Sequence, residues 1–419
     1  MGGFLSLRAT LRRVSPYSFP EDPLMRVSTL AFPALGLLGL LAFSAPAHAA
    51  EPGTPAKLRI IVENELALSR SSETVEVPVA SLSRLASDEG LARVHVVDST
   101  TGKEVLAQVV DSDGDGRADL LVFQADFAPN ERRAFDFTLG EKRVYRREDF
   151  RVYGRFVRER YDDFAWENDR TAHRMYGAAL ETWDKEPLTS STVDIWLKRT
   201  RRLVINDWYL VDDYHRDTGE GADFYSAGKS RGCGGSGLWQ EGALVVSKNF
   251  RLSRVLAAGP IRLVFELVYP VWDKAGIRQE TKRITLDAGH NLSRFESRYV
   301  FDGPHPDSIA VGIKKQTKAE RRVERAAGWM RTWEPVAGKD AGSFGCGVVF
   351  DPAAVREVTE ADGNYLLVGG LPEGKPVSYY AGAGWDRSGD FAAAADWDRY
   401  LEEWSRRVRS PLRQEVQAP

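Results

Sequence analysis

The sequence predicts an all-β protein of antiparallel sheets, in which a small β-sandwich module precedes a larger domain. Apolar and polar residues alternate along residues 261–269 and 294–301, as in antiparallel strands with one face in the core. Short runs rich in valine, isoleucine and phenylalanine, bounded by polar turns, fill residues 57–139. Helical spacing of apolar residues is confined to two short segments.

The N-terminus has the three parts of a secretory signal peptide. Met25 and Arg26 precede an apolar run over residues 30–43, and Ala47 and Ala49 form an A-x-A cleavage site. We therefore expect residues 1–49 to be removed, with Met25 as the true start, and the mature protein to be periplasmic or secreted. The apolar run is too short for a good membrane span, so no membrane span is expected after cleavage.

Composition describes a globular chain with an ample core. About 370 residues follow the signal peptide, and the chain is 43% hydrophobic and 28% charged. The net charge of −3 gives no support for nucleic-acid binding. Eleven tryptophans and fourteen tyrosines favour stacking on carbohydrate in an exported protein, although ordinary core packing explains most of them individually.

The two cysteines, Cys233 and Cys346, each lie between glycines. An oxidising compartment favours a disulfide, which would close a loop of more than a hundred residues and add about 4–5 kcal/mol in the chain-entropy model. Two buried free thiols are the other interpretation.

Residues 50–141 are expected to form the N-terminal β-sandwich module, since this length is typical of such modules. Its strands are predicted at residues 58–62, 74–79, 94–97, 120–123 and 134–137. A basic connector with seven arginines follows at residues 142–160 and is either a solvated linker or a positive rim for an anionic substrate.

The larger domain is expected over residues 161–410. One short helix is predicted at residues 172–180. A second helix is predicted at residues 396–408, where apolar side chains at helical spacing would lie across a sheet. These side chains are Trp397, Tyr400, Leu401 and Trp404.

An aspartate-rich turn is the first candidate site. Its carboxylates alternate with small residues, as Ca²⁺ ligands do, but position twelve of an EF-hand loop is Val122 and not glutamate. The candidate metal ligands are Asp111, Asp113, Asp115 and Asp119. We expect a structural calcium ion here and no cofactor for catalysis; a solvated hairpin turn is the alternative.

Residues 163–177 form the second candidate, because a core element would not bury so many polar groups. The candidate substrate-binding residues are Trp166, Glu167, Asn168, Arg170, His173 and Arg174, with Tyr176 as a candidate acid. If Asn168 caps a helix, Arg170 and Arg174 lie one turn apart and form a carboxylate clamp. A surface helix with internal salt bridges is the alternative.

The loop over residues 212–239 is the third candidate, since a long glycine-rich loop in a compact β protein is typical of a binding or catalytic loop. His215 and Tyr214 offer an acid/base pair, and Arg231 suits a carboxylate. Further candidate binding residues are Glu220, Tyr225, Trp239 and, on the preceding strand, Lys198. A structural loop with a hydrogen-bonded histidine is the alternative.

These segments resemble a known family. Residues 163–177, the loop 214–239 and the run Arg254-Val255-Leu256-Ala257-Ala258-Gly259-Pro260-Ile261-Arg262 are similar to DUF4861, a family of exported bacterial proteins found near genes for degrading pectin and ulvan. The resemblance covers residues 58–404 and implies oligosaccharide dehydratase activity. Residues 254–301 also resemble the β-supersandwich of galactose mutarotase-like proteins, which epimerases, lyases and sugar-binding modules share.

The resemblance and the candidate residues together predict an enzyme that cleaves an anionic, uronate-containing oligosaccharide by β-elimination, as a lyase or dehydratase. Arg170, Arg174 and Arg231 would neutralise the sugar carboxylate. His215 would take the C5 proton, and Tyr214 or Tyr176 would protonate the leaving oxygen. The loop bearing His215 and Arg231 should then face residues 166–176 across one cleft.

Two other functions remain open. A glycoside hydrolase would use Glu167 with Glu220 or Asp223, provided that the carboxyl groups lie about 5–9.5 Å apart across a cleft. A non-catalytic carbohydrate-binding protein would use Trp166, Trp196 and Trp239 as its platform.

The signal peptide gives the first testable prediction. The mature protein should begin near Ala50, because cleavage follows the A-x-A site. Mass spectrometry of the protein recovered from the periplasm measures this directly, and an intact apolar run in that protein would disprove it.

Overall fold

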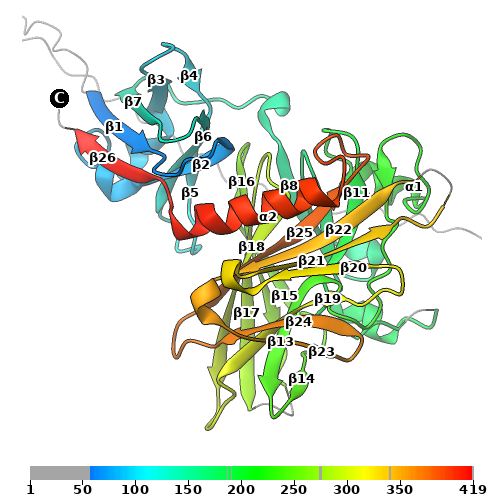
Figure 1. Cartoon of the computed structure of the whole chain (residues 1–419). Coiled ribbons are helices and arrows are strands. Elements are labelled where there is room, and N and C mark those ends of the chain that lie inside the picture. Colours follow the sequence, from blue (N-terminus) through cyan, green and yellow to red (C-terminus); the bar gives the residue numbers. More distant parts are fainter. Residues whose placement is uncertain (1–56, 186, 190, 273–275, 339–340, 418–419) are drawn as a thin grey trace, which may run out of the picture. The chain divides into compact units, whose positions relative to one another are not determined.

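The computed structural model describes residues 57–417, apart from 186, 190, 273–275 and 339–340 (Figure 1). The predicted signal peptide lies outside the described residues. The described chain consists mostly of antiparallel strands, which confirms the all-β prediction. No helix in this part of the chain is long and apolar enough to cross a membrane.

The N-terminal module is a pair of small sheets around one core, with strand orders β26-β1-β7-β3-β4 and β2-β6-β5. Its strands are β1 (Lys57–Glu63), β2 (Arg70–Pro78), β3 (Val94–Asp98), β4 (Glu104–Val105), β5 (Ala107–Val110), β6 (Leu120–Phe127), β7 (Arg132–Leu139) and β26 (Arg413–Gln417). The core is built on phenylalanines, and Phe123 and Phe135 lie 4.7 Å apart between ring centroids. Because β26 pairs with β1, the C-terminal strand completes the module that the first strand begins.

The larger domain contains three antiparallel sheets. The strand orders are β15-β16-β17-β18-β25-β22-β21-β20, β14-β13-β19-β24-β23 and β12-β11-β10-β9-β8. Its elements before residue 260 are β8 (Val152–Val157), β9 (Asp163–Asn168), β10 (Ala172–Met175), β11 (Asp194–Lys198), α1 (Ile205–Val211), β12 (Gly221–Ala222), β13 (Cys233–Gln240), β14 (Ala243–Val245) and β15 (Leu252–Ala258).

The elements after residue 260 supply most of the eight-stranded sheet. They are β16 (Arg262–Tyr269), β17 (Ile277–Asp287), β18 (Leu292–Phe301), β19 (Ser308–Lys314), β20 (Glu320–Glu324), β21 (Trp329–Pro335), β22 (Ser343–Phe350), β23 (Val355–Ala361), β24 (Asn364–Gly370), β25 (Val377–Trp385) and α2 (Ala394–Arg409).

The two faces of the eight-stranded sheet differ in character. Leu263, Phe265 and Leu267 of β16 are fully buried in a core that also takes residues from both other sheets of the domain. The alternate positions, such as Arg262 and Glu266, point to the opposite face. The predicted period-two strands are therefore confirmed, and the polar half of the pattern marks the outer face of this sheet.

Helix α2 lies across β22 and β21, as the sequence predicted for residues 396–408 (Figure 1). Glycines in the sheet make this close packing possible. A Cβ atom at Gly347 would lie 2.8 Å from Leu401 and Trp397, so no larger residue fits there without a shift. Cys346, between two such glycines, is buried in the core, and both cysteines are free.

The helix predicted at residues 172–180 is wrong. Residues 172–175 form the strand β10, which pairs with β9 on one side and β11 on the other, and a 3-10 helix follows at Ala178–Thr182. Asn168 caps no helix: its Oδ1 accepts hydrogen bonds from the N–H groups of Arg170 and Thr171 and closes the turn between β9 and β10. Within residues 142–160, the strand β8 pairs with β9.

One side chain of the N-terminal module is inserted into the larger domain. The buried Gln108 donates to the carbonyl of Arg262 (2.9 Å) and accepts from the N–H groups of Ile261 (3.0 Å) and Arg262 (2.8 Å). Gly259 leaves room for it, because a Cβ atom there would lie 2.3 Å from the Gln108 side chain. The amide therefore satisfies backbone groups at the start of β16.

Replacing Gln108 by alanine should lower the free energy of unfolding by about 2–4 kcal/mol, because buried backbone groups lose their partner. Urea unfolding measures the change. Lys103→Ala, at an exposed position of the same module, is the control and should change stability by less than about 0.5 kcal/mol. Equal stability of the two variants would contradict the role given to Gln108.

Candidate functional site

Several residues predicted to bind substrate lie in the sheet β12-β11-β10-β9-β8 and are buried there. Glu167 and Lys198 form an ion pair of 2.7 Å with both side chains fully buried. The Glu167 carboxylate also accepts from the N–H groups of Val204 (2.7 Å) and Ile205 (2.8 Å), where α1 begins. This pair anchors α1, so Glu167 cannot be one of the two carboxyl groups of a hydrolase cleft.

The predicted tryptophan platform is also wrong. Trp166 and Trp196 are fully buried, and Trp239 is half-buried. His173 stacks on Trp166 with a centroid distance of 5.1 Å, and burial lowers the pKa of His173 to about 3. These rings belong to the core because β9, β10 and β11 are covered on both faces, which their mixed polar composition did not indicate.

The predicted arginine clamp is not assembled. Arg231 is buried, and its Nη1 donates to the Ser191 hydroxyl at 3.1 Å and the Ser236 carbonyl at 3.2 Å. Burial lowers the pKa of Arg231 to about 10. Arg170 instead binds Asp390, a carboxylate that it shares with Arg201. The three arginines therefore serve different parts of the domain.

Arg174 lies in a buried network of charged groups. It donates to Asp194 from Nε at 2.8 Å and to Asp223 from Nη2 at 2.9 Å, and the Tyr176 hydroxyl donates to Asp194 at 3.0 Å. Burial raises the pKa of nearby Asp163 to about 7. Burial and the neighbouring Asp194 raise the pKa of Asp223 as well. Carboxylates of the protein itself thus occupy the Arg174 guanidinium, which is not available to clamp a substrate carboxylate as predicted.

His215 lies against Asp223 of its own loop. Its Nδ1 lies 3.1 Å from the carbonyl oxygen of Asp223 and 3.7 Å from the carboxylate that Arg174 binds. The His215 side chain is 64% exposed. Tyr214 is buried, and its hydroxyl accepts from Arg160 at 2.7 Å and Arg174 at 3.4 Å.

The remaining loop residues are held within the protein. Tyr225 is buried, and Glu220 pairs with Arg202 at 2.5 Å. The loop therefore brings together His215, Asp223 and Arg174 but leaves out Arg231, and Tyr214 and Tyr176 lie beneath the surface. Whether His215 acts as a base stays a prediction.

The aspartate-rich turn gathers three of its four predicted ligands. Carboxylate oxygens of Asp111, Asp113 and Asp115 lie within 4.8 Å of one another. Asp119 instead accepts from the N–H group of Ser112 at 2.7 Å and from its hydroxyl. The turn thus presents three convergent carboxylates and uses the fourth to close itself.

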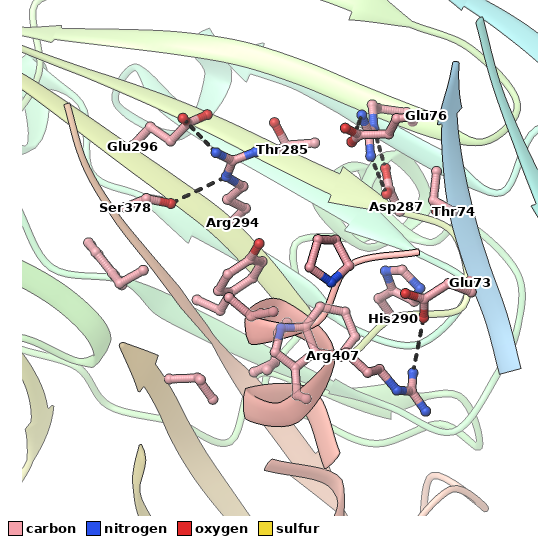
Figure 2. Close-up of a pocket in the computed structure, with 18 of the residues that line it drawn as sticks. Glu73, Thr74, Glu76, Thr285, Asp287, His290, Arg294, Glu296, Ser378 and Arg407 are labelled. Atoms are coloured by element: carbon pink, nitrogen blue, oxygen red, sulfur yellow. Dashed lines mark hydrogen bonds and ion pairs between the residues drawn. The ribbon is translucent and has the colours of Figure 1, made fainter. Parts of the chain in front are cut away.

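A polar cavity of about 700 Å³ lies where the outer face of the eight-stranded sheet meets β2 and the C-terminal end of α2 (Figure 2). None of the residues predicted from the sequence to bind substrate or metal lines it. Its polar and aromatic lining includes Glu73, Glu76, Arg262, Arg283, Asp287, His290, Arg294, Glu296, Ser378, Tyr380, Trp404 and Arg407. This size and this position between modules are typical of a small-molecule site.

Ion pairs define two sides of the cavity. Arg262 holds Asp287 through two bonds of 2.7 Å and also contacts Glu76 at 2.5 Å. Burial alone would raise the pKa of Asp287, but the Arg262 guanidinium outweighs burial and holds it below its usual value. Across the cavity, Arg294 donates to Glu296 at 2.9 Å and approaches the Ser378 hydroxyl at 3.3 Å (Figure 2).

The hydrogen-bond donors of the lining differ in whether a ligand can reach them. Among the described residues, neither Trp404 Nε1 nor Arg407 Nε has a hydrogen-bond partner, although both atoms are buried. The Arg294 side chain keeps 41% of its surface exposed despite its ion pair. Arg294 is therefore a donor that a ligand in the cavity can reach, and a guanidinium group favours a ligand with oxygen atoms.

The segment 163–177 supports the turn that bears His290, one of the residues that line the cavity. Asn168 Nδ2 donates to the carbonyls of Asp287 (2.6 Å) and His290 (2.7 Å), and Asp169 accepts from the N–H group of Gly289 (2.7 Å). His290 Nε2 lies 2.9 Å from the carbonyl of Ser72. Burial lowers the pKa of His290, so its ring is neutral at pH 7.

The cavity residues were not predicted from the sequence, because they are spread over several strands and form no local motif. Arg262, Arg283 and Arg294 occupy outward positions of three neighbouring strands, β16, β17 and β18. The period-two alternation that predicted the strands therefore also showed that one face of this sheet carries many charged residues. It could not reveal that β2 and α2 cover part of that face.

The chain belongs to the family described as Domain of unknown function (DUF4861), which matches residues 62–413. A relative in Formosa agariphila, named "Uncharacterized protein P7", is 33% identical over 375 residues, which is 85% of this chain and 93% of the relative.

Two solved structures from Enterococcus faecalis resemble the fold. A protein in the glycosyl hydrolase family 38 has a TM-score of 0.48 at 11% identity, and an alpha-mannosidase has a TM-score of 0.46 at 12% identity. Each alignment covers 86% of this chain, but the chain spans about half the length of these structures, 47% and 46%. At these values the likeness carries no argument about activity.

Proposed function

We propose that the protein is an exported carbohydrate-active enzyme that acts on uronate-containing oligosaccharides by β-elimination, as a lyase or dehydratase, and that the substrate binds in the cavity of Figure 2. The observation that carries this proposal is the half-exposed guanidinium of Arg294 in a cavity whose lining also holds the rings of Tyr380 and Trp404. Carboxylate and hydroxyl oxygens of an acidic sugar match this lining.

The chemistry places three demands on the site. A cation must neutralise the C6 carboxylate, which makes the C5 proton more acidic. A base must accept that proton, and an acid must protonate the leaving oxygen. Arg294 lies on the outer face of the sheet at the cavity and suits the first demand, since guanidinium groups bind carboxylates in a fixed geometry, whereas Arg283 already donates to Glu266.

The aromatic lining suits the sugar rings themselves. Trp404 and Tyr380 lie 5.6 Å apart between centroids at the end of the cavity beneath α2. Apolar ring faces next to charged groups are typical of sites that bind a sugar by both its C–H face and its hydroxyls. The hydrolase predicted from the sequence lacks one of its two carboxyl groups, because Glu167 anchors α1 instead of facing a cleft.

Incubation with ulvan or pectin oligosaccharides should raise absorbance near 235 nm, as the unsaturated uronate product forms. Arg294→Ala should lower kcat/KM by something like 10²-fold, with effects on both KM and kcat, because a carboxylate contact acts in ground and transition states. Arg298→Ala is the matched control, since Arg298 is exposed, lies on the same strand and face, and does not line the cavity.

Three outcomes would contradict this proposal. New reducing ends without absorbance would indicate hydrolysis. Retained binding without any product would indicate a carbohydrate-binding protein. Equal loss of activity in the Arg294 and Arg298 variants would remove the cavity from the reaction.

We also propose that Asp111, Asp113 and Asp115 hold a structural calcium ion, because their carboxylate oxygens converge within 4.8 Å. EDTA should then lower the melting temperature by several degrees, since an ion bound only to the folded state stabilises it by mass action. Asp111→Asn combined with Asp113→Asn should abolish this response. An unchanged melting curve, with no calcium by elemental analysis, would disprove the site.

A further inference from the structure

We infer that His290 is the base and Tyr380 the acid of the elimination, with Arg294 holding the substrate carboxylate between them. This inference rests on the proposed function and gives the reaction residues that differ from His215 and Tyr214. It depends on three features of the cavity, namely a fixed histidine tautomer, a phenol opposite an arginine, and a shared tryptophan.

The tautomer of His290 is set by its surroundings. A carbonyl oxygen can only accept a hydrogen bond, so the contact from Nε2 to the Ser72 carbonyl places the ring proton on Nε2. The lone pair therefore lies on Nδ1, and the ring stays neutral at pH 7 because burial lowers its pKa. A neutral imidazole with a fixed lone pair is the form that accepts a proton.

Tyr380 is placed by the pairing of β18 with β25. Arg294 and Tyr380 are directly opposite each other in this pair, so their side chains project from the same face of the sheet. Burial raises the pKa of Tyr380, so its hydroxyl keeps its proton at pH 7. A protonated phenol next to a guanidinium can deliver a proton to an oxygen close to the bound carboxylate.

Trp404 brings the two candidate groups into one neighbourhood. Its ring lies 4.9 Å from His290 and 5.6 Å from Tyr380 between centroids, edge to face in both cases. Figure 2 shows His290 and Arg294 facing the same cavity from different sides. The assignment requires that one sugar ring in this cavity reaches these groups, because the reaction takes place at adjacent carbon atoms.

The proposed step balances without a cofactor. The Nδ1 lone pair of His290 forms an N–H bond as the C5–H bond breaks, and the electron pair moves to the carboxylate that Arg294 stabilises. That pair then forms the C4=C5 bond as the C4–O bond breaks. The departing oxygen takes the proton of Tyr380 and leaves as an alcohol or as water. Solvent returns the proton from His290 to Tyr380.

Residues predicted from the sequence now act as positioning residues. Asn168 binds the carbonyls on both sides of the turn that bears His290, and Asp169 binds the N–H group of Gly289 within it. Gln124 of the N-terminal module adds a bond of 2.8 Å to the carbonyl of Ala288. The turn is therefore held by the larger domain and by the module at the same time.

The test compares four variants on the same uronate oligosaccharides at 235 nm. His290→Gln and Tyr380→Phe should each lower kcat by something like 10²–10⁴-fold while KM changes little, the usual scale for a lost acid or base. His290→Gln keeps an N–H group for Ser72, and Tyr380→Phe removes one oxygen, so melting temperatures should stay close to that of the wild type. His305→Ala, at an exposed histidine outside the cavity, should keep full activity.

His215→Ala decides between the two histidines. Full activity in this variant, together with the loss in His290→Gln, supports the inference. Loss of activity in His215→Ala with normal activity in His290→Gln overturns it and leaves the elimination reaction in place. A wild-type protein that produces no absorbance at 235 nm overturns the proposed function and the assignment of roles together.

Discussion

The Arg262 guanidinium is the contact on which the arrangement of the cavity depends. It neutralises Asp287 through two hydrogen bonds and reaches Glu76 on the strand β2 of the N-terminal module. The backbone of the same residue is bound by Gln108 of that module. A buried polar group must keep its partner, so the module cannot move away without leaving the backbone groups of Ile261 and Arg262 without the Gln108 amide and Arg262 without Glu76. This constraint keeps β2 against the sheet and gives the cavity one of its sides.

The eight-stranded sheet has two faces that follow different rules. One face is apolar and packs into the core that all three sheets of the larger domain share. The other is charged, and α2 and the N-terminal module each cover a part of it. The glycines of β22 let α2 approach closely at one end of the sheet, and this leaves the charged positions of β16 to β18 to line the cavity. The same face of the sheet thus packs closely against α2 at β22 and lines the polar cavity at β16 to β18.

The polar residues of β9 to β11 show how chemistry-bearing side chains can serve structure. Glu167 and Lys198 neutralise each other in the interior and fix the start of α1. Arg174 is surrounded by the carboxylates of Asp194 and Asp223. Asn168 satisfies two carbonyl groups of the turn before β18. A buried polar group needs a partner within the protein. A segment rich in charged residues can therefore form an internal hydrogen-bond network instead of a substrate-binding site.

Local pattern decided the fold class and many of the strands. Period-two alternation is a property of a single strand, so the strands around residues 261–269 and 294–301 could be predicted without their neighbours. The helix at residues 396–408 was predictable for the same reason, whereas residues 172–175 became a strand because β9 and β11 supply hydrogen-bond partners on both sides. The site was decided by tertiary structure. Whether an arginine is enclosed by carboxylates, as Arg174 is, or keeps an exposed edge in a cavity, as Arg294 does beside Glu296, depends on how distant parts of the chain pack around it, because charge interactions act through space and not along the chain.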